Sequence, residues 1–191
     1  MAKSLIIVES PAKAKTITKY LGKEYTVHAS VGHIKNLPKS SLGVDIENGY
    51  APSLEVIKGK EDIVKGLRDT VKKVDSIYIA TDPDREGEAI AADIAEEIGD
   101  ANPKIYRVLF HEITERGVTE AMKNPVKINT DLVASQRARR VMDRIVGYKV
   151  SPFVWKTLYY GLSAGRVQSV ALKLICEREM QIREFTPTEY W

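Results

Sequence analysis

The first two thirds of the chain alternate short apolar runs with segments whose apolar residues recur at helical spacing. The apolar runs are rich in β-branched and aromatic residues and predict strands at residues 5–8, 25–31, 76–81 and 104–110. The amphipathic segments predict helices at residues 12–21, 61–74, 89–98 and 115–122. Strands that alternate with helices favour βαβ units, so we expect an α/β fold with a mainly parallel sheet and helices on both faces.

The strand pattern ends near Asn124-Pro125, so we expect one domain at residues 1–125 and an all-α segment at residues 126–191. Within the first domain, residues 39–58 have no regular period and predict a long connection with room for a short hairpin. The helices predicted for the second segment are Asp131–Val146, ended by Gly147, then one that starts at Ser151-Pro152, and a long one that follows residues 161–169 and reaches about Arg183.

Two of the predicted strands end in the same way, with an acidic residue followed by a proline and a helix. Glu9 precedes Ser10-Pro11, and Asp82 precedes Pro83. A proline in the first helical turn has a φ angle already suited to a helix. Ligands of an open parallel sheet bind beyond the carboxyl ends of its strands, so Glu9 and Asp82 would share one crevice if their strands are neighbours.

Four carboxylates crowd the second of these junctions, at Asp82, Asp84, Glu86 and Glu88. Like charges this close repel one another, and a cation among them relieves the repulsion. Hard oxygen ligands suit Mg²⁺, which typically takes one or two carboxylates together with phosphates and water. An alternative needs no metal: Asp82 would cap the helix, Pro83 would be its first residue, and the later acids would complement the helix dipole. The companion junction at Glu9 favours the metal site.

The composition is that of an ordinary globular protein, with 43% hydrophobic and 29% charged residues among 191. There is no run of eighteen apolar residues and no signal-peptide pattern, so we expect no membrane association. The single cysteine, Cys176, excludes an internal disulfide, which is typical of a cytoplasmic protein. Its apolar surroundings predict a position in the core.

Charge is unevenly distributed, although the net value is only +3. Residues 131–173 contain eight basic and two acidic residues, a net charge of +6. Arg137, Arg140 and Arg144 lie along one flank of a predicted helix. A basic segment beside an acidic cluster suggests a polyanion held near a metal, whereas an arginine flank alone is also common on solvated helices.

Small residues precede the last predicted helix, where backbone amides at a helix N-terminus can bind an anion. Arg166 and Gln168 would reinforce such a site, so we expect contact with a phosphate backbone. His33 could contact a phosphate or orient a carboxylate, and the alternative is a purely local hydrogen bond. The candidate phosphate-contacting residues are His33, Arg137, Arg140, Arg144, Ser163, Gly165, Arg166, Gln168 and Ser169.

Six stretches of the sequence, in the same order, resemble those of bacterial type IA DNA topoisomerases of the topoisomerase I branch. They are residues 7–14, 32–34, 81–90, 110–114, 138–140 with 143–148, and 162–169. An acidic strand end with Asp-x-Asp also occurs in other Toprim proteins, such as primases and some nucleases. The stretch from Ser163 to Ser169 is far more specific to this family.

The resemblance implies a Toprim-type, Rossmann-like domain followed by the first part of a helical domain that binds single-stranded DNA. It makes Asp82, Asp84 and Glu86 an acidic triad that holds Mg²⁺, with Glu9 as a further candidate ligand. It also places Glu9 at the cleavage site, for proton transfer, and lets Lys13 offer positive charge to the scissile phosphate. The implied activity is relaxation of negatively supercoiled DNA, by cleaving and rejoining one strand through a transient phosphotyrosyl link.

The sequence departs from the family at the nucleophile, a tyrosine that the family carries in a Tyr-x-Arg-Thr-Asp motif of a later domain. No such motif occurs here, and none of the nine tyrosines matches it. The resemblance therefore implies part of a longer enzyme, whose remaining C-terminal domains are its partner, and a chain that does not relax supercoils alone. Two other interpretations stay open: a self-sufficient Toprim nuclease or primase-like enzyme, and a noncatalytic nucleic-acid-binding module.

Overall fold

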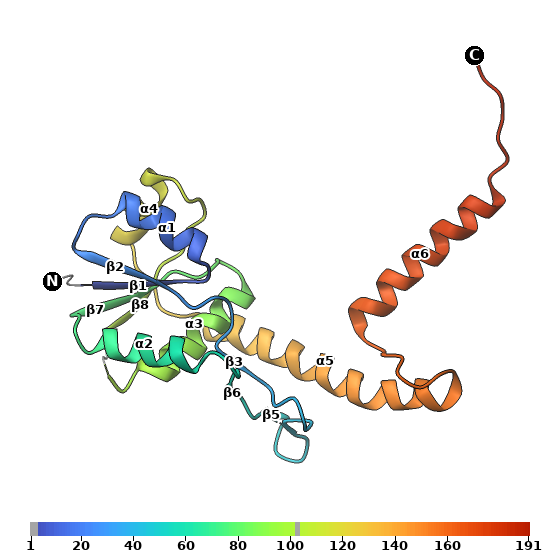
Figure 1. The fold of residues 1–191 in the computed structure, drawn as a ribbon, viewed down its shortest axis with the longest axis horizontal. Helices are drawn as coiled ribbons and strands as arrows, with labels where there is room; N and C mark the ends of the chain where they lie inside the picture. Colours follow the sequence, from blue (N-terminus) through green and yellow to red (C-terminus); the bar gives the residue numbers. More distant parts are fainter. Residues whose placement is uncertain (1–3, 102–103) are drawn as a thin grey trace. The chain divides into compact units, whose positions relative to one another are not determined.

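The computed structural model describes residues 4–101 and 104–191. It forms two compact units, one ending at Ala138 and the other running from Arg139 to Trp191. The first unit is built on a four-stranded parallel sheet with the strand order β2-β1-β7-β8 (Figure 1). Its strands are β1 (Ser4–Val8), β2 (Tyr25–Ala29), β7 (Ser76–Ile79) and β8 (Ile105–Arg107). All four lie where the sequence predicts strands, although three of them end earlier than predicted.

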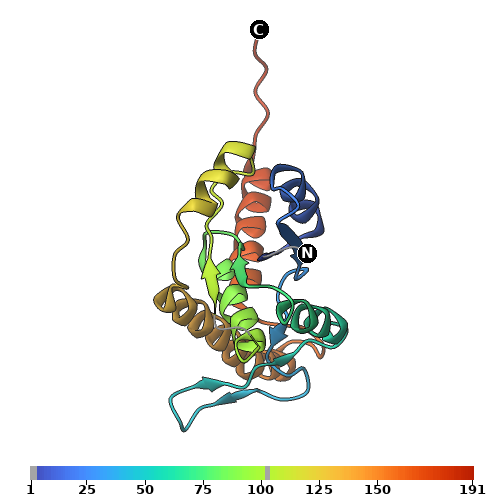
Figure 2. The same ribbon diagram turned by 90° about the vertical axis from the view of Figure 1, so that its left-hand side faces the viewer.

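Helices cover both faces of this sheet (Figures 1 and 2). On one face pack α1 (Pro11–Tyr20) and α4 (Glu115–Lys123), and on the other pack α2 (Glu61–Val71) and α3 (Arg85–Ile98). The α/β fold predicted from the alternating pattern is confirmed. Because the four strands are parallel, their carboxyl ends all lie at the same edge of the sheet.

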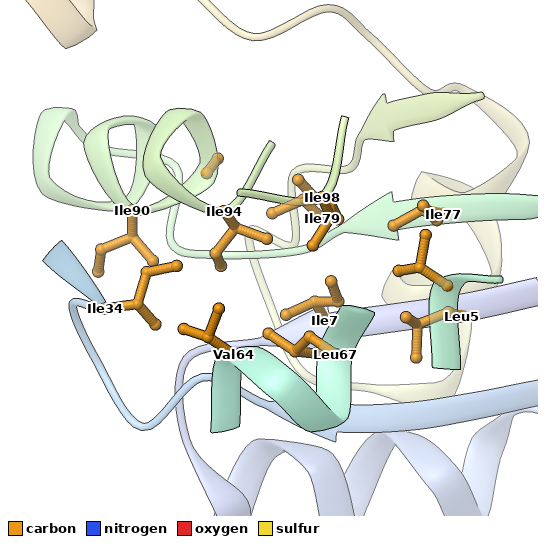
Figure 3. Packing of buried hydrophobic residues seen from close by; sticks show 12 residues of the cluster. Leu5, Ile7, Ile34, Val64, Leu67, Ile77, Ile79, Ile90, Ile94 and Ile98 are labelled. Carbon is orange, nitrogen blue, oxygen red and sulfur yellow. The ribbon is translucent and has the colours of Figure 1, made fainter. Parts of the chain in front are cut away.

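The apolar runs of the strands fill both faces, because successive side chains of a strand point to opposite sides. In β1, Leu5 and Ile7 join the core between the sheet and helices α2 and α3 (Figure 3). Ile6 and Val8 join the separate core beneath α1 and α4. All four side chains are fully buried, so β1 is a rigid base for Glu9, which follows it.

The long connection between β2 and α2 contains two short antiparallel ladders. These are β3 (Lys35–Asn36) with β6 (Glu55–Val56), and β4 (Val44–Asp45) with β5 (Ala51–Pro52). The connection predicted from its irregular pattern therefore includes the short hairpin for which it has room.

Helix α5 (Thr130–Thr157) begins in the first unit and continues into the second. It runs without a break through Gly147 and Pro152, so the predicted end at Gly147 and the new start at Ser151-Pro152 are wrong. An interior glycine costs a helix about 1 kcal/mol, and an interior proline costs about 3 kcal/mol through a lost hydrogen bond and a clash with the preceding turn, so both positions weaken α5 without ending it. The Ser151 hydroxyl accepts a hydrogen bond of 3.0 Å from the Ala164 N–H instead of capping a new helix.

The last helix, α6 (Arg166–Glu184), lies where the sequence predicts a long helix. None of its residues is buried in the part of the chain that the structure describes. Cys176 is exposed, so its predicted core position is wrong. An apolar pattern shows which face of a helix is suited to burial, but it does not show that another surface packs against that face. No helix within residues 4–101 and 104–191 is long and apolar enough to cross a membrane.

Candidate functional site

The ends of β1 and β7 bring two acidic residues together. The strands are parallel neighbours, with Ile7 paired to Ile79, so the chain leaves both strands at the same edge of the sheet. Glu9 follows β1 and Asp82 follows β7, and the Asp82 backbone N–H donates a hydrogen bond of 2.5 Å to Glu9 Oε1. Glu9 and Asp82 therefore meet at the ends of neighbouring strands, as the sequence predicts for that case.

Lys13 supplies a cation to these two acids. Its ammonium contacts Asp82 Oδ1 and lies 4.0 Å from Glu9 Oε2. Lys13 extends from the first turn of α1, whose N-cap residue, Ser10, accepts a hydrogen bond from the Lys13 N–H. A cation in the first turn opposes the helix dipole, so the carboxylates rather than the helix stabilise the ammonium. Glu9, Lys13 and Asp82 are called here the strand-end group, and the Asp82 side chain is 49% exposed and open to a ligand.

Asp84 is the N-cap of α3. Its Oδ1 accepts a hydrogen bond of 2.7 Å from the Gly87 N–H. The alternative in which Asp82 caps the helix and Pro83 is its first residue is therefore wrong, and the acid that does cap lies two residues later. The Asp82 carbonyl, which would accept the first hydrogen bond of a helix capped at Asp82, accepts one from Arg107 instead.

Gly87 brings the first turn of α3 into direct contact with the backbone of Asp82. A Cβ atom at Gly87 would lie 2.0 Å from the Asp82 carbonyl oxygen, so no side chain fits there. Thr81 adds a buried hydrogen bond of 2.6 Å from its hydroxyl to the Gly87 carbonyl. The strand end and the helix start are thus packed as one piece.

Glu86 belongs to a second group of polar side chains. Its Oε2 accepts a hydrogen bond of 3.0 Å from Gln136 Nε2 and lies 3.2 Å from His33 Nε2. Asp93, almost fully buried on α3, lies 4.0 Å from His33 Nδ1 and 3.4 Å from Arg137 Nη2. His33 and Arg137, two candidates for phosphate contact, therefore face carboxylates of the first unit in this structure.

Glu88 points into the core, away from the other acids of the junction. Its side chain is 4% exposed, and Oε1 accepts a hydrogen bond of 2.7 Å from Arg107 Nε on β8. Burial lowers the pKa of Arg107, and the neighbouring Glu88 carboxylate opposes that shift. Glu88 is a buried counter-ion, so the junction presents three acids to the sheet edge instead of the four counted from the sequence.

These three acids suit Mg²⁺ by their chemistry, but they do not form a preassembled cage. In residues 4–101 and 104–191, no three His, Cys, Asp or Glu side chains converge closely enough to hold a metal ion. Asp82, Asp84 and Glu86 each face a different partner. Mg²⁺ commonly takes only one or two carboxylates and completes its shell with phosphate oxygens and water. The carboxylate oxygens of Asp82, Asp84 and Glu86 therefore fit a Mg²⁺ site that is completed by a phosphate. In this structure the Lys13 ammonium supplies the positive charge at Asp82.

The start of α6 in the second unit carries an arginine that is already paired. The Arg166 guanidinium donates two hydrogen bonds of 2.9 Å to the Asp143 carboxylate of α5. These bonds lower the pKa of Asp143 and raise that of Arg166. Any phosphate bound by Arg166 would have to share it with Asp143.

The other candidates of residues 163–169 lie around the same helix start. The Ser163 hydroxyl donates to Gln168 Oε1 at 3.2 Å, and the Ser169 hydroxyl donates to the carbonyl of Gly165, the N-cap residue, at 2.9 Å. On α5, Arg144 donates to the Tyr148 hydroxyl at 3.0 Å and lies over its ring. Arg140, one turn before Arg144 on α5, is half-buried.

Residues that the sequence analysis did not single out also shape the first unit's site. Arg107 had one sequence signal, a charge within an apolar strand run, while Gln136 had none. Lys60 donates a hydrogen bond of 2.5 Å to the carbonyl of Val31, whose φ of 57° is strained for a β-branched residue. These contacts join residues far apart in the sequence, so local patterns do not reveal them.

Comparisons with known proteins match both parts of the chain. A family model described as a Toprim domain matches residues 4–113, and one described as DNA topoisomerase matches residues 127–191. The full-length topoisomerase I from Thermotoga maritima has a similar structure over 97% of this chain, with 52% sequence identity and a TM-score of 0.83. This chain spans 32% of that protein's length. The sequence stretches, the parallel sheet with its acidic edge and these matches agree, and the chain belongs to the type IA DNA topoisomerases, as an N-terminal portion that begins with their Toprim domain.

Proposed function

We propose that this chain is part of an enzyme that relaxes negatively supercoiled DNA by cleaving and rejoining one strand through a transient phosphotyrosyl link. The observation that carries the proposal is the strand-end group, in which Glu9, Lys13 and Asp82 meet at the edge of a parallel sheet. The similarity to the Thermotoga maritima topoisomerase I supports the class of reaction. The tyrosine that forms the link would come from the remaining C-terminal domains of the enzyme.

The roles proposed for the strand-end group follow from its charges. Lys13 would lie against the scissile phosphate and offset its negative charge. Glu9 has one oxygen fixed by the Asp82 N–H and the other near the Lys13 ammonium, so it is held in place to exchange a proton with the leaving oxygen. Mg²⁺, held by Asp82, Asp84 and Glu86 with Glu9 as a further ligand, would add positive charge at the same phosphate.

Single-stranded DNA would be bound mainly by the helical segment at residues 126–191, which follows a Toprim domain at residues 1–125 in the sequence. The family matches, which end at residue 113 and resume at residue 127, support this division, and the net charge of +6 over residues 131–173 supports the partner. The proposed contacts are His33, Arg137, Arg140, Arg144, Ser163, Gly165, Arg166, Gln168 and Ser169.

The proposed activity is tested by mixing this chain with the part of the Thermotoga maritima topoisomerase I that it does not cover. We expect neither component alone to relax a negatively supercoiled plasmid, and the mixture to relax it when Mg²⁺ is present. Asp82→Asn should abolish relaxation by the mixture. Asp75 precedes the first residue of β7, at the end of the strand away from Asp82, so Asp75→Asn should leave relaxation by the mixture unchanged.

Two outcomes would contradict the proposal. Relaxation by this chain alone would show that it needs no tyrosine from another domain. Mg²⁺-dependent cutting of single-stranded DNA by this chain alone, lost in Asp82→Asn, would support a self-sufficient nuclease in its place.

The metal site is tested separately, by isothermal titration of this chain with Mg²⁺. Asp82→Asn and Asp84→Asn should each raise the Mg²⁺ dissociation constant by about 10-fold or more, since even residues that only support a metal ligand change affinity about 10- to 100-fold. Asparagine is as good an N-cap as aspartate, so Asp84→Asn removes the charge while keeping the helix start. Asp75→Asn is the matched control, and equal affinity in all variants would mean that the acids act only as caps and ion pairs.

A further inference from the structure

The side chain of Arg107 is fully buried beneath the stretch from Asp82 to Glu88, called here the acidic junction. Its guanidinium donates to four acceptors, among them the Ile79 carbonyl at 3.1 Å and the Val108 carbonyl at 2.6 Å. The other two are Glu88 Oε1 at 2.7 Å and the Asp82 carbonyl at 2.8 Å. One planar group therefore connects β7, β8, the start of α3 and the peptide that follows Asp82.

Glu88 extends this network to the start of α5. Its second oxygen, Oε2, accepts a hydrogen bond of 2.9 Å from the Asn129 N–H. The Asn129 side chain in turn accepts hydrogen bonds from the N–H groups of Asp131 and Leu132, in the first turn of α5. The buried pair thus connects the acidic junction with the beginning of the helix that carries Arg137.

The attraction between the two charges does not by itself explain a buried pair at this place. Replacing a buried ion pair by apolar side chains of similar volume is often neutral or stabilising, because it removes the cost of desolvating two charges. The side chains of the adjacent core are apolar, but an apolar pair would remove the hydrogen bonds to the carbonyls of Ile79, Val108 and Asp82 and to the Asn129 N–H. What an apolar pair lacks is the rigid fork of donors with which a guanidinium fixes several carbonyls at once.

Asp82 is the residue that this fork holds most directly at the sheet edge. Its carbonyl is bound by Arg107 and its N–H by Glu9, so the backbone on both sides of its Cα is fixed. Pro83 follows and has a fixed φ angle. The backbone therefore sets the direction of the Asp82 Cα–Cβ bond, from which the carboxylate reaches Lys13.

We propose that Arg107, together with Glu88, is a positioning residue that aims the Asp82 carboxylate into the strand-end group. The inference rests on the proposed function in one respect, which is that the Asp82 carboxylate binds Mg²⁺. The positioning itself concerns this chain alone. It predicts that the network can be replaced without unfolding the chain, but not without moving Asp82.

The test compares Arg107→Lys, which keeps the charge and loses the fork, with the double variant Glu88→Leu/Arg107→Met, which removes both charges. The control is Arg68→Lys. Arg68 also bonds a carboxylate and a carbonyl, both of Glu97, but it lies on the exposed surface of α2. The measurements are the urea midpoint, the ¹H–¹⁵N resonance of the Asp82 amide, and the Mg²⁺ dissociation constant.

We expect the double variant to fold with a lower urea midpoint, because the backbone groups that Arg107 and Glu88 bond lose these partners. In both Arg107 variants the Asp82 amide should lose the resonance position set by its bond to Glu9, and the Mg²⁺ dissociation constant should rise about 10-fold. Arg68→Lys should change neither. If Arg107→Lys does not fold, the double variant alone supplies these measurements.

A double variant with the parental Asp82 resonance and the parental Mg²⁺ affinity would overturn the proposal, because the pair would then be structural only. If the parent chain binds no Mg²⁺, the proposed metal site fails, and the Asp82 resonance still decides whether Arg107 positions this residue. The two failures are therefore distinguishable.

Discussion

At the scale of single residues, the site depends on how closely the first turn of α3 approaches the strand before it. Gly87 lies against the Asp82 carbonyl, where a Cβ would be 2.0 Å from the oxygen and 2.8 Å from the carbon and nitrogen of the same residue. These are backbone atoms, which cannot rotate away as a flexible side chain can. The glycine is required by close approach, since its φ angle is not in the left-handed region.

Gly87→Ala should lower the free energy of unfolding by about 3 kcal/mol, the upper end of what overpacking usually costs. Urea denaturation followed by circular dichroism measures this change. Gly66→Ala is the matched control: it lies inside α2 with nothing within 4 Å of the added Cβ, so it should stabilise the chain by about 0.5–1 kcal/mol. Similar effects at the two positions would contradict the close packing of α3 on Asp82.

The sequence was informative about residues that end a predicted strand and less so about residues placed by tertiary contacts. Glu9 and Asp82 could be predicted to meet because each follows an apolar run and parallel strands end at one edge. The alternative with Asp82 as the N-cap is wrong, and the hydrogen bond from Arg107 to the Asp82 carbonyl, which moves the cap to Asp84, has no local signature in the sequence. Glu88 counts among the four carboxylates of the junction in the sequence for the same reason, since only the fold shows its buried partner.

At the scale of elements, the strands and helices of the first unit could be predicted from periodicity. The continuity of α5 through Gly147 and Pro152 could not. The sequence predicts a stop at Gly147 and a new start at Ser151-Pro152, because glycine and proline are poor in helix interiors. The helix continues through both, and Ser151 uses its hydroxyl for the chain after the helix. Local propensity is a weak constraint when the rest of a long helix is intact.

The Arg166–Asp143 pair connects α5 with the start of α6, and its contribution depends on pH. The hydrogen bonds from Arg166 lower the pKa of Asp143 below its usual value of 3.8. A carboxylate whose pKa is lowered by folding stabilises the folded state above its usual pKa, and this contribution is lost as the pH falls through the lowered value. The effect should be small, because the two side chains are 39% and 41% exposed and water screens their attraction.

A ¹³C NMR titration of the Asp143 carboxylate measures this directly. Its midpoint should lie below 3.8 in the parent chain and return toward 3.8 in Arg166→Gln. Arg178→Gln, about 18 Å further along the same helix, is the control and should leave the midpoint unchanged. An Asp143 midpoint that does not respond to Arg166→Gln would contradict the pairing.

At the scale of the whole molecule, the α/β class followed from the alternation of periods, because parallel strands need helical crossovers and both sheet faces then become buried. The second unit was harder to predict. The apolar helical pattern around Cys176 predicts a core position for this residue, yet Cys176 is exposed and no residue of α6 within the described chain is buried. A hydrophobic pattern reports which face of a helix is suited to burial, and the partner surface has to be known separately.

The ammonium of Lys13 is carried by the same chain as the Asp82 carboxylate that it contacts, so dialysis and dilution cannot remove it. A chain stripped of divalent ions therefore keeps a built-in counter-charge at the sheet edge, and chelation should not drive its acids apart. The arrival of a metal at Asp82 would be an exchange of one positive charge for another. The lysine released by that exchange would be free to meet the negative charge of a phosphate.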